Sequence, residues 1–242
     1  MWQYTYLAIN FFTVIICFLF SFHPKIKFNQ YFKSFIMASA SAAVFFIIWD
    51  AWFTKEGVWW FNDHYLIGIR FLGLPVEELM FFICIPFSCV FTYHCLDKFF
   101  RLDWKENTER IFVIVSITVL LCLSVYFEQK IYPLMTFLTT AVSLFLLYFI
   151  LKVQWIGKAS LIYLILMPGF VAVNGILTGT GLESPIVNYN PEKIIGLRIL
   201  TIPVEDVVYG YEMILWNLFF FKLFSGKESL NAYGKEDKII KT

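Results

Sequence analysis

Ile67–Glu78 reads IGIRFLGLPVEE, and Ile195–Asp206 reads IGLRILTIPVED, so twelve residues recur without a gap 128 positions later. Seven of the twelve positions are identical, and each copy ends in Pro-Val-Glu followed by a second acid. A long apolar stretch follows each copy. Carboxylates at the head of a membrane-length helix are costly to retain and are a hypothesis for a functional site. The repeat therefore predicts four catalytic candidates, Glu77, Glu78, Glu205 and Asp206.

The composition around this repeat is that of an integral membrane protein. The 242 residues are 60% hydrophobic and 15% charged, with a mean hydropathy of +0.71. A net charge of +1 gives no reason to expect a nucleic-acid partner. We predict an all-α fold with seven transmembrane spans, the third kinked or broken at Pro86. The spans are Tyr4–Phe22, Phe35–Phe53, Leu74–Leu96, Ile111–Phe127, Tyr132–Leu151, Ala159–Leu177 and Leu200–Phe224.

The spacing of the two copies predicts how the spans are arranged. Three helices reverse the direction of the chain, and the fourth span restores it, so the two copies become parallel. This is a 3+1+3 tandem repeat about an axis along the membrane normal. The third and seventh spans would then face each other, with their acids converging on one cavity. The expected divisions are residues 1–96 (first repeat), 97–131 (loop and linking helix), 132–224 (second repeat) and 225–242 (a polar, disordered tail).

Lysine and arginine set the expected orientation. Fourteen of them fall on the side of the membrane that carries the C-terminus, and five fall on the other side. The positive-inside rule predicts a multi-pass protein of the cell membrane, with its N-terminus outside and its C-terminus in the cytoplasm.

The four acids have a structural and a functional interpretation. A proline at a helix start and acids in the first helical turn are common stabilising features, and Pro75 and Pro203 fit that pattern. Alternatively, the acids lie below an apolar roof, where burial disfavours the charged form and a carboxylic acid can act as a proton donor. Arg70 and Arg198 each precede an acid pair by seven residues. We hypothesise that each arginine holds one acid of its pair ionised.

Aromatic residues gather before the first motif, where Trp52, Trp59 and Trp60 follow Asp50. They are typical of an interfacial aromatic belt, or they form a wall whose ring faces stabilise a cation. On the seventh span, Glu205, Tyr209 and Glu212 share one helix face. The residues expected to contact a substrate are Asp50, Trp49, Trp59, Tyr209 and Asn174.

Several other kinds of site have no support in the sequence. The five cysteines lie in apolar stretches without a Cys-x-x-Cys pair, and the three histidines lack ligand spacing, so no metal site is expected. A Rossmann Gly-rich fingerprint is absent, so no flavin or nicotinamide cofactor is evident. A requirement for a redox cofactor stays open, as does the oligomeric state. The seventh span has no mid-helix lysine for a retinal Schiff base.

Two stretches resemble the membrane-type lycopene cyclase domain. The first is Trp49-Asp50, Gly57-Val58-Trp59, Gly68-Ile69-Arg70 and Pro75-Val76-Glu77-Glu78-Leu79; the second is Leu177–Pro185, Tyr189-Asn190 and Thr201–Asp206 with Tyr209-Gly210. The hallmark of this family is Pro-x-Glu-Glu/Asp in each half, and both copies are intact. The resemblance extends to about Phe224 and matches the fused two-repeat form. It implies a lycopene β-cyclase, an intramolecular lyase or isomerase of carotenoid biosynthesis.

The implied reaction converts the linear ends of lycopene to β-rings, giving γ- and β-carotene without net redox change. It needs an acid, a base and aromatic walls that exclude water. The implied partners are lycopene or a related carotenoid and the lipid bilayer. Two alternatives remain: a small 3+1+3 membrane transporter, and a non-catalytic carotenoid- or retinal-binding membrane protein. Only a cyclase would change the pigments of lycopene-making cells.

Overall fold

A computed structural model describes residues 2–239, and it describes side chains for residues 2–226. Within this part, all seven expected spans are helices that are long and apolar enough to cross a membrane. The helices are α1 (Thr5–Phe20), α2 (Phe32–Lys55), α3 (Val76–Phe99), α4 (Glu106–Tyr126), α5 (Ile131–Phe145), α6 (Ile156–Leu177) and α7 (Val204–Ile239). Short helical turns adjoin three of them at Trp2–Tyr4, Phe28–Tyr31 and Leu146–Ile150, and a fourth, Asp63–Tyr65, lies in the loop between α2 and α3. The predicted all-helical class is confirmed.

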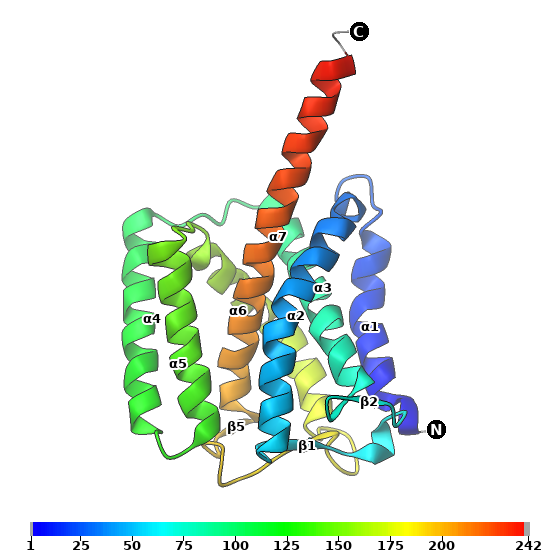
Figure 1. The fold of residues 1–242 in the computed structure, drawn as a ribbon, viewed down its shortest axis with the longest axis vertical. Helices are drawn as coiled ribbons and strands as arrows, with labels where there is room; N and C mark the ends of the chain where they lie inside the picture. Colours follow the sequence, from blue (N-terminus) through cyan, green and yellow to red (C-terminus); the bar gives the residue numbers. More distant parts are fainter. Residues whose placement is uncertain (1, 240–242) are drawn as a thin grey trace.

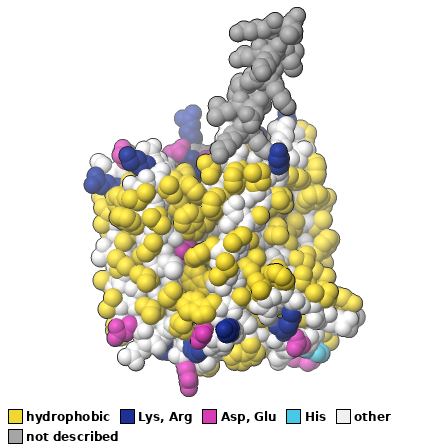
Figure 2. Space-filling view, viewed as in Figure 1, with side chains coloured by type: hydrophobic (Ala, Val, Ile, Leu, Met, Phe, Trp, Pro, Cys, Tyr) yellow, Lys and Arg dark blue, Asp and Glu magenta, His cyan; other side chains and the backbone are white. Residues whose placement is uncertain are grey.

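The outer surface of the bundle is apolar along most of its height. Figure 2 shows hydrophobic side chains across the middle of one face and charged side chains mainly at its two ends. Large apolar side chains such as Phe12, Ile16 and Val125 are more than 60% exposed. Such a surface would promote association in water, but it suits contact with lipid chains. The seven helices and this apolar surface indicate a multi-pass membrane protein.

In Figure 1, α2 and α7 run together through the centre of the bundle, with α1 and α3 on one side and α4 and α5 on the other. The N-terminus lies at one end of the bundle and the C-terminus at the opposite end. Two apolar clusters fill the interior. One contains Phe28, Phe87 and Phe221. The other is richer in Trp and Tyr and lies at the end that carries the N-terminus.

Three two-stranded antiparallel ribbons close that end of the bundle. β1 (Trp59–Phe61) pairs with β4 (Val187–Tyr189), placing Trp59 opposite Tyr189 and Phe61 opposite Val187. This pairing joins the loop before the first motif to the loop before the second. The other two ribbons are short hairpins within the motifs. They are β2 (Arg70–Phe71) with β3 (Leu74–Pro75), and β5 (Arg198–Ile199) with β6 (Ile202–Pro203).

Each motif folds as a tight hairpin that leads directly into a helix. Leu72 and Gly73 have φ of 53° and 85°, and Leu200 has φ of 56°, so both turns use left-handed backbone. Pro75 is the residue immediately before α3, with extended backbone, rather than a residue of its first turn. The two acids that follow lie in the first turn, where the helix dipole favours negative charge. Local sequence thus explains why the acids head these helices.

Two parts of the chain differ from the sequence-based prediction: the helix around Pro86 and the segment from Ser225. Pro86 does not break the third span, because α3 is one continuous helix from Val76 to Phe99. A proline removes one backbone hydrogen bond, and the packed neighbours of α3 hold the helix together. The sequence predicts a disordered tail from Ser225, whereas α7 continues as a helix to Ile239. Residues 240–242 lie outside the described part of the chain.

Candidate functional site

A cavity of about 300 Å³ lies inside the bundle, beneath the β1–β4 ribbon. Its walls come mainly from α1, α3, α6 and α7, with one residue each from α2 (Asp50) and α5 (Tyr132). The ribbon closes one end of the cavity with Trp59, Phe61, Val187 and Tyr189. Most of its surface is apolar. Three carboxyl groups line it, from Asp50, Glu78 and Asp206. Each of these three side chains is less than 10% exposed.

Glu78 and Asp206 each accept hydrogen bonds from buried phenols. The hydroxyl of Tyr6 on α1 donates to Oε2 of Glu78 at 2.5 Å. The hydroxyl of Tyr132 on α5 donates to Oδ1 of Asp206 at 2.6 Å, and that of Tyr189 donates to Oδ2 at 2.8 Å. Short hydrogen bonds of this kind orient a carboxyl group and tune its proton affinity. In an apolar cavity, such groups can give up or accept a proton.

Tyr189 lies in β4, in the ribbon that covers the cavity. Burial, and next the neighbouring carboxyl group of Asp206, raise the pKa of the Tyr189 phenol well above its ordinary value. The phenol therefore keeps its proton at neutral pH. It acts as a hydrogen-bond donor to Asp206, and β4 holds it in place.

The first acid of each motif has a different environment. Glu77 and Glu205 are fully buried but do not line the cavity. The backbone N–H of Ile67 donates to Oε1 of Glu77 at 2.7 Å, and the N–H of Ile195 does the same to Glu205. Each glutamate thus ties the start of its motif to the head of the following helix. The four acids do not converge on the cavity as expected, because adjacent helical residues point about 100° apart.

Asp50 lies near the end of α2 and faces the cavity. Its Oδ1 accepts a 2.5 Å hydrogen bond from Nε1 of Trp59, and its Oδ2 has no hydrogen-bond partner among the described residues. Trp59 is the inward-facing tryptophan of β1. Trp52 and Trp60 are instead exposed, as in an interfacial belt. Of the three tryptophans expected around Asp50, one lies in the wall.

The other expected substrate contacts are close to this group. Tyr209 lines the cavity, and its ring meets the ring of Trp49 edge to face, with centroids 5.4 Å apart. Trp49 therefore supports the wall from behind, since it does not line the cavity. Asn174 lines the cavity from α6, and its Nδ2 donates to the carbonyl of Phe170 at 3.2 Å.

Neither arginine forms an ion pair with an acid of its motif among the described residues; that each arginine holds one acid ionised stays a hypothesis. The guanidinium of Arg70 forms a 2.6 Å ion pair with Asp63 and donates to the carbonyl of Gly73 across the hairpin. Arg198 donates to the carbonyl of Thr201 and lies over the ring of Tyr189, 5.8 Å from its centroid. Both guanidinium groups donate to a backbone carbonyl of their own hairpin turn, Gly73 for Arg70 and Thr201 for Arg198.

Several buried polar residues were not predicted from sequence. Tyr6 and Tyr132 stand near the starts of the first and fifth spans, 126 positions apart, close to the 128-residue period of the motifs. This similar spacing is the sequence feature that could have predicted that the two tyrosines are equivalent.

Glu212 shares a helix face with Tyr209 by its spacing, but its side chain points toward α5. It accepts hydrogen bonds from Thr139, Thr140 and Ser143, and it does not line the cavity.

Metal ligation finds no support in the part of the chain that is described. No group of three or more His, Cys, Asp and Glu side chains with the geometry to hold a metal ion occurs there. The groups that line the cavity and could take part in chemistry are carboxyl groups, phenols and aromatic rings.

Comparison with known proteins gives partial but consistent matches. Three fungal proteins named bifunctional lycopene cyclase/phytoene synthase match. That of Neurospora crassa is 32% identical over 85 residues, which is 32% of this chain and 14% of the relative. That of Pyrenophora tritici-repentis is 29% identical over 84 residues, 35% of this chain and 14% of the relative. The aligned part is thus about one-seventh of each relative's length. No solved structure matches the chain significantly.

A protein-family comparison covers far more of the sequence. The lycopene cyclase family matches residues 3–96 and again residues 129–224. The two segments contain α1, α2, α5, α6 and the larger part of α3 and α7, with both Pro-Val-Glu motifs and the residues that surround the cavity. Since the matched segments make up well over half of the chain, this protein belongs to the lycopene cyclase family.

Proposed function

We propose that the protein is a lycopene β-cyclase that forms rings by acid–base chemistry without net redox change. A carboxylic acid protonates the terminal double bond of the linear substrate, which leaves a tertiary carbocation. The neighbouring double bond attacks this cation and forms the new carbon–carbon bond of the ring. A carboxylate then removes a ring proton, which restores a double bond. One proton is added and one is lost, so no reductant or oxidant is needed.

One observation carries this proposal: Glu78 and Asp206, the second acids of the two motifs, line the same apolar cavity. Each is held by at least one phenol, so their positions are defined. A pair of carboxyl groups in unlike environments can divide the roles of acid and base. Glu78 has one phenol partner and Asp206 has two, which stabilises a negative charge better at Asp206. We assign Glu78 as the proton donor and Asp206 as the base.

Glu77 and Glu205 are positioning residues in this scheme, so only two of the four candidates expected from sequence act on the substrate. Their carboxyl groups bind backbone N–H groups and keep each hairpin against its helix. The neighbouring acid is thereby oriented toward the cavity. Replacement by glutamine preserves an oxygen acceptor for the backbone N–H, so the amide variants keep the main interaction.

The aromatic residues around the carboxyl groups suit a cationic intermediate. Trp59 and Tyr209 line the cavity, with ring centroids 6.4 Å apart, and Phe81 lines it from α3. Ring faces stabilise a carbocation that has no hydrogen-bonding groups. They also exclude water, which would otherwise trap the cation as an alcohol. Asp50, beside Trp59, adds negative charge or a dipole at the same end of the cavity.

We also propose the 3+1+3 arrangement, with residues 1–96 and 132–224 as the two repeats, residues 97–131 as the connection and residues 225–242 as a cytoplasmic tail. Its support is the set of matching contacts. Tyr6 and Tyr132 bond the second acid of each motif, and Ile67 and Ile195 bond the first.

The basic residues favour a cytoplasmic C-terminus and an outer N-terminus in the cell membrane. A reporter enzyme active only in the cytoplasm should work after Thr242 and fail within residues 55–63.

The decisive experiment is pigment analysis of bacterial cells that make lycopene and express this chain. A cyclase converts lycopene to γ-carotene or β-carotene, which chromatography separates. A chain carrying both Glu78→Gln and Asp206→Asn, present in the membrane at the same level, should leave lycopene unchanged. If the parent chain also leaves lycopene unchanged, the protein is a transporter or a non-catalytic carotenoid-binding protein, and the proposal fails.

A further inference from the structure

The cavity is long and narrow, with its polar groups at one end. Along α6, the lining residues run from Leu177 to Tyr163, which at ~1.5 Å per residue covers about 20 Å of the helix. Asp50, Glu78 and Asp206 lie at the end beneath the β1–β4 ribbon. The rest of the cavity extends toward the middle of the bundle, between helices that are long enough to cross a membrane.

The wall away from the carboxyl groups offers no free hydrogen-bond donors from its hydroxyl groups. The hydroxyl of Ser88 donates to the carbonyl of Thr13 at 2.7 Å, and that of Tyr163 donates to the carbonyl of Val207 at 2.7 Å. The remaining surface comes from apolar side chains such as Ile85, Leu166 and Phe170. Such a wall suits a hydrocarbon and would bind a polar ligand poorly.

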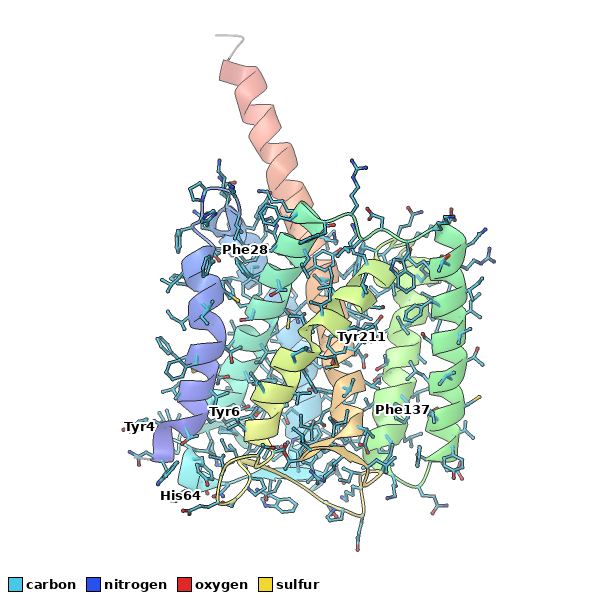
Figure 3. The ribbon with its side chains drawn as sticks, turned by 180° about the vertical axis from the view of Figure 1, so that it is seen from behind. Tyr4, Tyr6, Phe28, His64, Phe137 and Tyr211 are labelled. Carbon is cyan, nitrogen blue, oxygen red and sulfur yellow. The ribbon has the colours of Figure 1, made fainter. Side chains whose placement is uncertain are left out.

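Several residues of α6 that line the cavity are not fully buried. Gly169 lines the cavity and is exposed, and Phe170 and Val173, which also line it, are half-buried. No heavy atom lies within 4 Å of the position that a Cβ on Gly169 would take. Across the cavity, Thr13 on α1 is also half-buried. Figure 3 shows α1 and α6 on this face of the molecule, with Tyr6 between them and α3 behind.

We propose that Thr13, Gly169, Phe170 and Val173 frame a lateral opening between α1 and α6 that admits one end of a linear isoprenoid hydrocarbon from the bilayer. This inference rests on the proposed function for the identity of the ligand. The entering end reaches Glu78 and Asp206, while the rest of the chain extends along the cavity and out between the helices into lipid. A cavity of about 300 Å³ holds one end of such a substrate. A second ring therefore requires the molecule to leave and enter again by its other end.

The opening can be tested by adding bulk at Gly169, where a side chain meets free space. Gly169→Trp should fill the opening, and Gly169→Ala should not. Leu164→Trp is the matched control, because Leu164 lies on the same helix, is 65% exposed and does not line the cavity. Each variant is made in the parent chain, to measure ring formation, and in a Glu78→Gln chain, to measure lycopene that co-purifies with the protein in detergent.

Gly169→Trp should lower both ring formation and bound lycopene by about tenfold or more, and the other two variants should stay within about twofold of their parents. Membrane levels and thermal unfolding in detergent establish that each variant is folded. If Gly169→Trp does not accumulate, Val173→Trp takes its place under the same criteria. If the folded Gly169→Trp protein still binds lycopene and still forms rings, the proposed opening is wrong.

The two readouts separate this inference from the proposed function. If the parent chain forms no rings but retains lycopene, and Gly169→Trp loses that lycopene, the opening stands and the cyclase proposal fails. If the parent chain forms rings and Gly169→Trp forms them equally well, the cyclase proposal stands and the opening fails.

Discussion

The phenol of Tyr6, on the first helix, donates a 2.5 Å hydrogen bond to the carboxyl group of Glu78, at the head of the third helix. The two residues are separated by 72 positions in the chain. Tyr132 and Asp206 form the corresponding contact 74 positions apart, between the fifth and seventh helices. In both cases a tyrosine near the start of one span holds the second acid of a Pro-Val-Glu motif at the cavity wall.

The ranking of the four acids gives the first prediction. Glu78→Gln should lower β-ring formation by about 10²–10⁴-fold, because an amide cannot act as a general acid. Glu77→Gln should retain far more activity, since glutamine still accepts the N–H of Ile67. Product per unit of membrane-inserted protein is the measurement. A Glu77→Gln chain that is less active than Glu78→Gln would contradict the assignment.

The tyrosines are the second prediction. Tyr6→Phe removes the donor to Glu78 and leaves a buried acceptor unpaired, which costs ~1–3 kcal/mol. A loss of this size in transition-state stabilisation lowers the rate of ring formation by about 5- to 150-fold. Tyr126→Phe is the control, because Tyr126 is 78% exposed on α4. Equal activity of the two variants would remove Tyr6 from the site.

Arg70 provides the third prediction, and its direction differs from the one drawn from sequence. Its partner is the exposed Asp63, and an exposed ion pair contributes ~0–1 kcal/mol to stability. Arg70→Gln should therefore shift thermal unfolding in detergent only slightly and leave ring formation near that of the parent chain. Lys98→Gln, at the far end of α3, serves as the comparison. A large loss of activity in Arg70→Gln alone would restore the arginine to the site.

Glu212 gives the fourth prediction. Its carboxyl group accepts hydrogen bonds from three hydroxyls of α5 but does not line the cavity. Glu212→Ala should destabilise the folded protein by ~1–3 kcal/mol per unpaired buried group, and Glu212→Gln should cost less because it keeps acceptor oxygen. Thermal unfolding in detergent measures both. Glu128→Gln, at an exposed position, is the control.

For Glu212, activity distinguishes a structural role from a chemical one. The Glu212→Gln protein that remains folded should form rings at the parent rate, because the cavity is unchanged. A severe loss of product with normal unfolding temperature would show that Glu212 takes part in the reaction.

Sequence alone determined the membrane class, the seven spans and the placement of an acid pair at the head of two helices. These properties are local. A span is recognised by its apolar length, and a helix start by a proline and the acids that follow it. The repeat of Ile67–Glu78 in Ile195–Asp206 also indicates the two halves of the chain that the lycopene cyclase family matches.

Tertiary structure decided which acid of each pair faces the cavity. Glu77 and Glu78 are neighbours in sequence and point about 100° apart on α3. Which of them faces the cavity depends on how α3 is rotated about its axis, and packing against other helices fixes that rotation. The donors Tyr6 and Tyr132 lie 72 and 74 positions from the acids they bond, and Tyr189 lies 17 positions from Asp206, with the β5–β6 hairpin between them. The partner of Arg70 depends on the path of a two-residue turn. Such contacts depend on how separate segments pack against one another, so the sequence pattern of a single segment does not predict them.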